Sequence, residues 1–208
     1  LYKFGKASIR AAMDDQKAQA ILANNLRNAG WDKATVFVEK YIDATQRATG
    51  VADDQLRPAF SRFLGTTKNV YASQDLLNRA LDISAGTGKD LDTVISALTK
   101  SFAGNRKGLL SLNTNLTAAQ IKTMDMSEIL AVLEKQYKGS AATAAETFTG
   151  KLNRLKIAAS EASETIGYAL IDAFAQLAGN GDMARATTNL NTFSTAIADF
   201  IRQVSGAE

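Results

Sequence analysis

The chain of 208 residues contains no cysteine and no histidine. It therefore cannot form a Ser-His-Asp triad, a cysteine nucleophile, an imidazole base, or an ordinary zinc or iron–sulfur site. No disulfide framework can form either, so the sequence does not indicate a redox compartment. These absences exclude most enzyme classes, whereas carboxylate chemistry stays possible.

Proline and aromatic residues are also scarce, with Pro58 alone and 7% aromatics, whereas 36 residues are alanine against 12 Ile and 7 Val. Alanine is the strongest helix former, and β-branched residues favour strands, so the composition predicts an all-α fold. The 24 Lys and Arg residues nearly balance the 21 Asp and Glu residues. A net charge of +3 is too small to indicate a specific nucleic-acid binder.

The first helix is expected to run from the start to about Asn28, where Gly30 stops it. Asp32 is placed to cap a second helix, with Trp31 packing on Val36 as a hydrophobic staple. Together they predict a helical hairpin over residues 1–50.

Short helices are expected next, over residues 51–139. Pro58 indicates either a helix start or a turn over residues 53–57, and we favour a short helix with a kink. A later helix should stop at Gly86, with Thr87 and Asp90 forming the capping box of the next one.

Residues 106–125 are the least regular part of the sequence. They contain a possible capping box at Thr117 and Gln120, and a second one at Asp125 and Glu128 predicts another helix start.

The remaining residues, 140–208, show apolar residues at alternating steps of three and four from Ala145 to Ala173 and again from Met183 to Val204. This spacing predicts two long amphipathic, heptad-patterned helices that close either as a hairpin or between several copies of the chain. The whole is thus expected to be a multi-helix bundle or an elongated, coiled-coil-like assembly. Gly150 and Gly167 would let another backbone approach closely. The least charged stretch falls short of the ~20 apolar residues needed to span a bilayer.

Three groups of residues suggest chemistry and are better explained by structure. Residues 86–90 read Gly-Thr-Gly-Lys-Asp, but a P-loop would need glycine at Ile83 and a hydroxyl at Asp90. The acidic pairs at 14–15 and 53–54 lack the spacing of a calcium loop and suit a solvated face and a helix start. The basic clusters at 106–107 and 151–156 lack interleaved aromatics. We therefore predict no catalytic, cofactor-binding or metal-binding residue and no cofactor.

Several short sequence segments occur in a fixed order along the chain: TGVADDQLRPAF at 49–60, LLNRALDISAGTGKDL at 76–91, Gly104-Asn105, AAETFTGKL at 144–152, Glu161, Glu164 and IGYAL at 166–170. This ordered set resembles the tail tape measure proteins of long-tailed, siphovirus-like bacteriophages and prophages. The resemblance covers roughly residues 1–175 and is most specific over 49–105. Leu112-Asn113 departs from it, because the family is expected to have Leu-Gly there.

The resemblance implies a structural protein of the phage tail and not an enzyme. Such a segment would help to set tail length during assembly, occupy the tail lumen of the virion and assist genome ejection into the host. It would be made in the host cytoplasm. Its expected partners are further copies of itself, with a trimer as one candidate, tail chaperones, the tail tube and tail-tip or baseplate proteins, and the host envelope, but no specific nucleic acid.

Two rival interpretations stay open. The chain could be a compact helical interaction module that contacts tail-tip proteins or the host envelope. It could also carry a cell-wall-cleaving activity, although no Glu-Ser pairing of the transglycosylase type is visible. Solution scattering would separate a monomeric globule from an extended oligomer.

Overall fold

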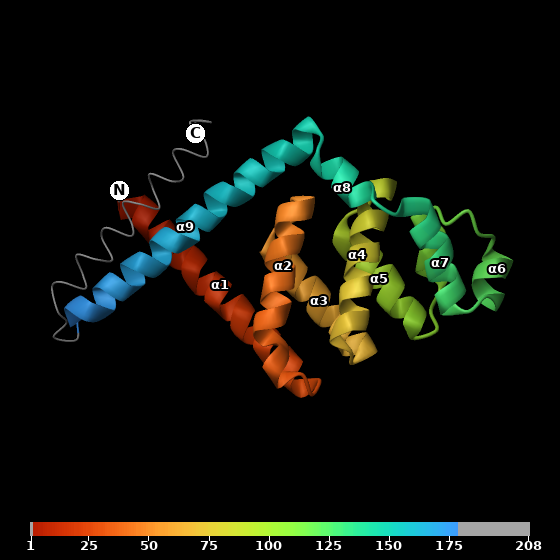
Figure 1. The fold of residues 1–208 in the computed structure, drawn as a ribbon, viewed down its shortest axis with the longest axis horizontal. Coiled ribbons are helices and arrows are strands. Elements are labelled where there is room, and N and C mark those ends of the chain that lie inside the picture. Colours follow the sequence, from red (N-terminus) through yellow and green to blue (C-terminus); the bar gives the residue numbers. More distant parts are fainter. Residues whose placement is uncertain (1, 179–208) are drawn as a thin grey trace. The chain divides into compact units, whose positions relative to one another are not determined.

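The computed structural model describes residues 2–178, and within that range every regular element is helical, which confirms the all-α prediction (Figure 1). The second predicted heptad seam, Met183 to Val204, and its Gly-Asn-Gly turn lie outside the described residues. The elements are α1 (Tyr2–Asn28), η1 (Asp32–Ala34), α2 (Thr35–Thr49), α3 (Asp53–Thr67), α4 (Val70–Thr87), α5 (Leu91–Phe102), η2 (Lys107–Leu112), α6 (Ala118–Thr123), α7 (Met126–Tyr137), α8 (Ser140–Ala145) and α9 (Phe148–Ala178), where η denotes a 3₁₀ helix.

The chain divides into two compact units. The central unit comprises residues 21–151, and the terminal unit comprises residues 1–20 together with 152–208. The helices α1 and α9 each contribute residues to both units. The segment borders that the sequence suggested, after residues 50 and 139, both fall inside the central unit.

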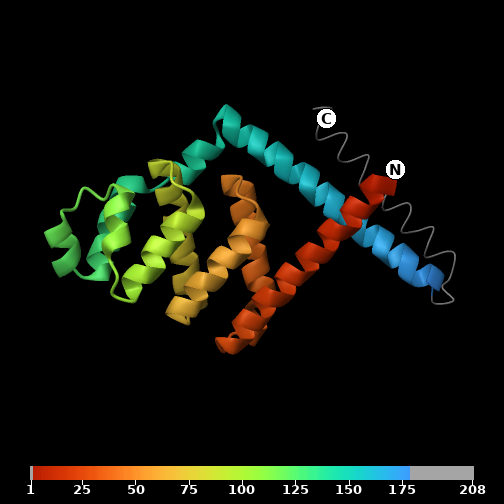
Figure 2. The same cartoon turned by 180° about the vertical axis from the view of Figure 1, so that it is seen from behind.

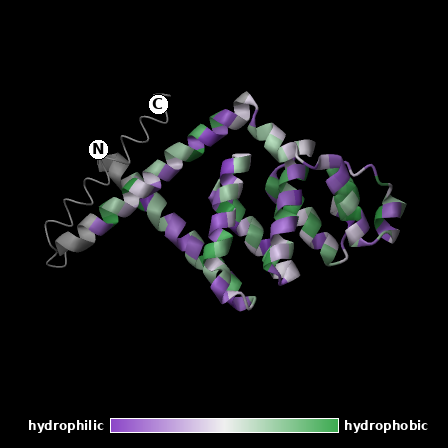
Figure 3. Ribbon diagram, viewed as in Figure 1, coloured by the Kyte–Doolittle hydropathy of each residue, from purple (hydrophilic) through white to green (hydrophobic). Residues whose placement is uncertain are grey.

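Helix α4 is the centre of the central unit, where it contacts α3, α5, α7 and α8. Both views of the ribbon show α2 to α5 side by side (Figures 1 and 2), and hydrophobic and hydrophilic positions alternate along each of these helices (Figure 3). Phe60 and Phe63 of α3 are fully buried, and burial of each such ring contributes about 1.5–3 kcal/mol. The largest fully buried side chains around them are Leu22, Leu26, Ile42, Leu56, Leu64, Leu77, Ile83, Ile95, Leu98 and Leu109.

Two predicted helix starts are confirmed in full. Thr117 and Gln120 form a reciprocal capping box at α6, and Asp125 and Glu128 form one at α7. In each, the cap side chain accepts from the backbone N–H three residues on, while the Gln or Glu side chain accepts from the cap N–H.

The predicted end of α4 and start of α5 are wrong by a few residues. α4 continues through Gly86 and Thr87, and Gly88 adopts the left-handed conformation that ends it (φ 71°). The Thr87 hydroxyl donates to the Ile83 carbonyl within α4, so it does not cap α5. Asp90 caps α5, accepting from the Thr93 N–H at 2.8 Å.

The predicted start of α2 is also wrong. Asp32 begins η1 and makes no capping hydrogen bond, and α2 starts at Thr35. Val36 is 68% exposed, so it does not complete a hydrophobic staple. Trp31 instead packs edge-on against Tyr71, whose distance along the chain hid this contact from sequence reasoning.

Pro58 neither begins a helix nor follows a separate turn. It lies in the second turn of α3, which begins at Asp53. The first turn is held by buried contacts on both sides of the proline, because Leu56 and Phe60 are in the core. In addition, Arg57 binds Asp53 at 2.6 Å. These interactions offset the hydrogen bond that proline cannot donate.

The apolar seam from Ala145 to Ala173 does not belong to one helix. α8 ends at Ala145 and α9 begins at Phe148, because the chain turns between them. Gly150 permits this turn, since a Cβ there would overlap the Ala144 and Ala145 carbonyl groups. The predicted close approach at Gly150 is confirmed, but its neighbour is the preceding helix.

In the terminal unit, α1 and α9 cross through small residues. A Cβ on Gly167 would overlap the Ser8 carbonyl, so the helix backbones touch at this point, as predicted for Gly167. Ser8 is fully buried and hydrogen-bonds to Ser163 at 3.1 Å. Further along the same pair of helices, the Tyr168 hydroxyl donates to Asp15 at 2.9 Å.

Asn113, at the departure from the expected Leu-Gly pair, ends η2 with a φ of 49°. Asparagine is one of the few residues other than glycine that tolerates the left-handed region, so it fits this position. Among the described residues, no helix is both long and apolar enough to cross a membrane.

Candidate functional site

One end of the central unit carries two exposed aromatic side chains, Phe37 and Tyr71, beside the half-buried Trp31. The last turns of α1 and α3 and the first turns of α2 and α4 meet there (Figures 1 and 2). We call the four residues Trp31, Val36, Phe37 and Tyr71 the aromatic patch.

Trp31 is positioned by the ends of two helices. Its backbone N–H donates to the Leu26 carbonyl at 2.8 Å, which closes the end of α1 after Gly30 turns the chain with a φ of 81°. Its indole Nε1 donates to the Lys68 carbonyl at 3.0 Å, at the left-handed residue that ends α3. Trp31 therefore joins α1 to α3, and its ring edge faces the start of α4.

The rings of the patch contact one another but leave much of their surface in water. Tyr71 lies between the other two, with ring centroids 6.0 Å from Trp31 and 5.9 Å from Phe37, both in edge-to-face geometry. Tyr71 is 63% exposed and Phe37 is 48% exposed. Folding alone therefore does not account for their apolar surface.

Tyr41, one turn after Phe37, links α2 to α4 by hydrogen bonds. Its hydroxyl donates to the Asn78 side chain at 2.8 Å and to the Gln74 carbonyl at 3.1 Å. Burial and the negative charge of Asp75 raise the pKa of Tyr41 to about 12, although the Thr45 hydroxyl opposes them. The phenol thus stays protonated. Its hydrogen bonds to α4 help to fix the distance between Phe37 on α2 and Tyr71 on α4.

Positive charge surrounds the patch. Lys33 in η1, Lys40 in α2 and Lys68 at the end of α3 are all exposed. Most acidic residues on η1, α2, α3 and the first turns of α4 are paired with arginine: Asp43 with Arg47, Glu39 and Asp53 with Arg57, and Asp75 with Arg79. Asp32 is exposed, and Asp54 lies in the first turn of α3, at the other end of that helix from Lys68. The immediate surroundings of the rings are therefore basic.

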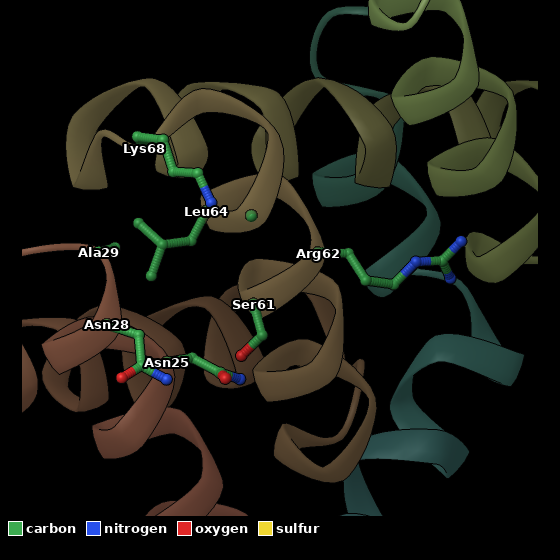
Figure 4. Close-up of a pocket in the computed structure, with 8 residues that line it drawn as sticks. Asn25, Asn28, Ala29, Ser61, Arg62, Leu64 and Lys68 are labelled. Atoms are coloured by element: carbon green, nitrogen blue, oxygen red, sulfur yellow. The ribbon is translucent and has the colours of Figure 1, made fainter.

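A groove of about 290 Å³ opens beside the patch, between α1 and α3 (Figure 4). Arg62 extends away from the rest of the lining, consistent with its ion pair with Asp92 and its hydrogen bond to Ser96. Gly65 leaves open space at the wall, since a Cβ there would meet nothing within 4 Å. The lining consists of Asn25, Asn28, Ala29, Ser61, Arg62, Leu64, Gly65 and Lys68.

The acidic pairs singled out in the sequence have separate local partners. Asp14 lies 3.9 Å from Arg10, and Asp15 accepts from Tyr168. Asp53 begins α3 and binds Arg57. Arg57 is buried and also forms an ion pair with Glu39 at 3.0 Å, which connects α3 to α2. Asp15 and Asp53 thus hold local structure, whereas Asp14 and Asp54 are exposed.

Most residues of the basic clusters either bind nearby backbone groups or are exposed. The Arg106 guanidinium donates to the Ile121 carbonyl at 3.0 Å and to the Met124 carbonyl at 2.6 Å, so it ends α6. Lys107, Lys151 and Lys156 are exposed. Among the described residues, no group of three or more acidic side chains could hold a metal ion.

The sequence contained one signal of the aromatic patch that spacing alone did not resolve. Val36, Phe37 and Val38 are consecutive, and a helix cannot turn three consecutive side chains towards one core. Val38 is the buried one. That Tyr71 joins the exposed pair follows only from side-chain contacts between α2 and α4.

The patch and the groove offer apolar faces, ammonium groups and amide hydrogen bonds, which is the chemistry of a binding surface. In comparisons with models of protein families, with curated proteins and with solved structures, no match to the chain was found.

Proposed function

We propose that the chain is a segment of a phage tail tape measure protein. The observation that carries the proposal is the ordered set of strings from Thr49 to Leu170 that resembles this family. An all-helical architecture agrees with such a role, because a helix converts residues into length at about 1.5 Å per residue. On this proposal the segment helps to set tail length, occupies the tail lumen and assists genome ejection, without enzymatic activity.

The proposed partners follow from that role. They are further copies of the chain, tail chaperones, the tail tube, tail-tip or baseplate proteins and the host envelope, and a trimer is one candidate state. The segment would be made in the host cytoplasm and carried in the virion.

The length that the central unit adds to the tail would depend on whether it is extended or folded. As one continuous helix, the roughly 130 residues of the central unit would span about 200 Å. Folded as a compact domain of that size, they would span about 35 Å. The change in tail length on deleting this unit therefore measures which form it takes inside the tail.

The test is an in-frame deletion of residues 21–151 in the phage or prophage that encodes the chain, joining Ala20 to Leu152, with tail length measured by electron microscopy. A tail shorter by about 35 Å supports a compact segment, and one shorter by about 200 Å supports an extended one. A companion variant inserts three heptads after Ala159 and should lengthen the tail by about 30 Å. Unchanged length in assembled tails of both variants contradicts the proposal.

A second candidate function, the compact interaction module, is favoured by one observation: the aromatic patch on a compact central unit. In that case the same deletion would leave tail length unchanged and lower infectivity. Solution scattering on the 208-residue chain would then give a monomeric globule, whereas an extended oligomer supports the tape measure role.

A further inference from the structure

The aromatic patch lies at the helix ends on one side of the central unit, and not along the helix faces that form the core. Tyr71 and Phe37 are 63% and 48% exposed, and Val36 is 68% exposed. They sit on first turns of helices, next to the connection from α1 to η1 (Figures 1 and 2). To bind a helical partner, a protein needs a long groove between two of its helices. To bind a planar surface, it needs only a few side chains that protrude at one end.

The side chains of the patch are those that favour a membrane–water interface. Trp31 and Tyr71 each combine an apolar ring with a polar group, and such residues gather at the headgroup level of bilayers. The indole N–H of Trp31 is already bonded to Lys68, so its ring can enter an apolar layer without an unsatisfied donor. Val36 and Phe37 add purely apolar surface beside it.

The charges select the kind of lipid. Lys33, Lys40 and Lys68 are exposed on the elements that carry the rings. Asp32, Asp43 and Asp75 are exposed there too, but Asp43 and Asp75 are paired with Arg47 and Arg79. Asp54 lies in the first turn of α3, at the other end of that helix from Lys68. Lysine side chains can reach towards lipid phosphates while their methylene groups cover apolar surface. A basic rim around an apolar centre complements anionic headgroups.

We propose that the aromatic patch docks the central unit on the surface of a lipid bilayer that contains anionic phospholipids. The rings enter the headgroup region and the three lysines contact phosphates. The inference rests on these side chains alone and does not depend on the role in tail length.

The chain has a built-in reporter for this contact, because Trp31 is its only tryptophan. The experiment adds the 208-residue chain to vesicles of phosphatidylcholine alone or mixed with phosphatidylglycerol, and follows tryptophan emission and co-flotation. We expect a blue shift and flotation with the anionic vesicles, both weakened at high salt. Bromine-labelled lipids should quench the emission.

Two pairs of matched variants test the assignment by flotation. Phe37→Ser should lower the partition coefficient about tenfold, since it removes a half-exposed ring from the contact. Its control is Phe102→Ser, which alters a ring that is 40% exposed on α5. The double variant Lys33→Gln with Lys40→Gln should lower binding by at least tenfold on anionic vesicles. Its control is Lys100→Gln with Lys122→Gln.

Circular dichroism of each variant verifies folding. Absence of flotation with anionic vesicles overturns the proposal, as does an equal loss in patch and control variants. A concentration-dependent blue shift without vesicles that Phe37→Ser abolishes also overturns it, because the patch would then join copies of the chain.

Discussion

Replacing Asp82 by alanine should loosen α8 from the central unit. Gly139, the residue that precedes α8, has no side chain to cap it. The cap comes from α4 instead, where the Asp82 carboxylate accepts from the Gly139 N–H at 3.0 Å and from the Ala141 N–H at 2.9 Å. One side chain thus satisfies two N–H groups of a helix that lies far away in the sequence.

The expected loss is about 2 kcal/mol. Removing a capping side chain costs about 0.5–2 kcal/mol, and the upper part of this range applies because the acceptor is charged and serves two donors. The helix dipole adds little, because α8 has only 6 residues. Asp82→Asn keeps one oxygen as an acceptor but loses the charge, so we expect about half the loss.

The assay is urea unfolding of the whole chain, followed by circular dichroism. With a slope near 2 kcal/mol per molar urea, Asp82→Ala should lower the midpoint by about 1 M. The control is Asp43→Ala, which removes an exposed ion pair with Arg47 and should cost about 0.5 kcal/mol or less. Amide hydrogen exchange should accelerate over α8 in the Asp82 variant before it does so elsewhere.

Equal midpoints for Asp82→Ala and Asp43→Ala would refute this reasoning. A loss that left exchange over α8 unchanged would also contradict it, because the carboxylate would then act on α4 alone.

Two further predictions concern packing and pH. Gly167→Ala should destabilise the chain by about 1–2 kcal/mol in thermal unfolding, because a Cβ there would overlap the Ser8 carbonyl and the gain in helix propensity only partly offsets this overlap. Gly65→Ala is the control: it adds a Cβ in open space on α3 and should stabilise the chain by about 0.5–1 kcal/mol. A change of the same sign in both variants would contradict the prediction. Because the pKa of Tyr41 is raised to about 12 from its usual 10, the unfolded chain loses this proton at lower pH than the folded chain does, so stability should fall by up to about 2–3 kcal/mol between pH 10 and 12. Urea midpoints measured across that range should fall less steeply for Tyr41→Phe, and parallel slopes would refute the assignment.

The features that could be predicted from the sequence are those whose partners are close in the chain. The capping boxes at Thr117 and Asp125 each involve residues three apart, so spacing alone determines them. The left-handed ends at Gly30 and Gly50 are equally local. The all-α class follows from the excess of alanine for the same reason, since helix propensity is a property of each residue.

The errors occur where distant contacts decide between local options. Trp31 could reach Val36, but it packs on Tyr71 and bonds to Lys68. Ala145 and Phe148 continue one apolar period, yet the chain turns between them as α8 packs on α2 and α4. The sequence does not predict the aromatic patch for the same reason, because Tyr71 meets Trp31 and Phe37 only in the folded chain.

The way α8 closes the central unit also has a kinetic consequence. Most of the packing in this unit joins helices that follow one another in the chain, such as α3 with α4 and α4 with α5, and such local contacts form quickly. Other pairs, such as α4 with α7, join helices that are further apart, and α8 with α2 has the largest separation of these along the chain. During synthesis the earlier helices can therefore pack as they emerge, before residues 140–145 are available to cover α2 and α4. We expect α8 to dock last, so variants of α8 should slow completion of the fold without altering its early stages.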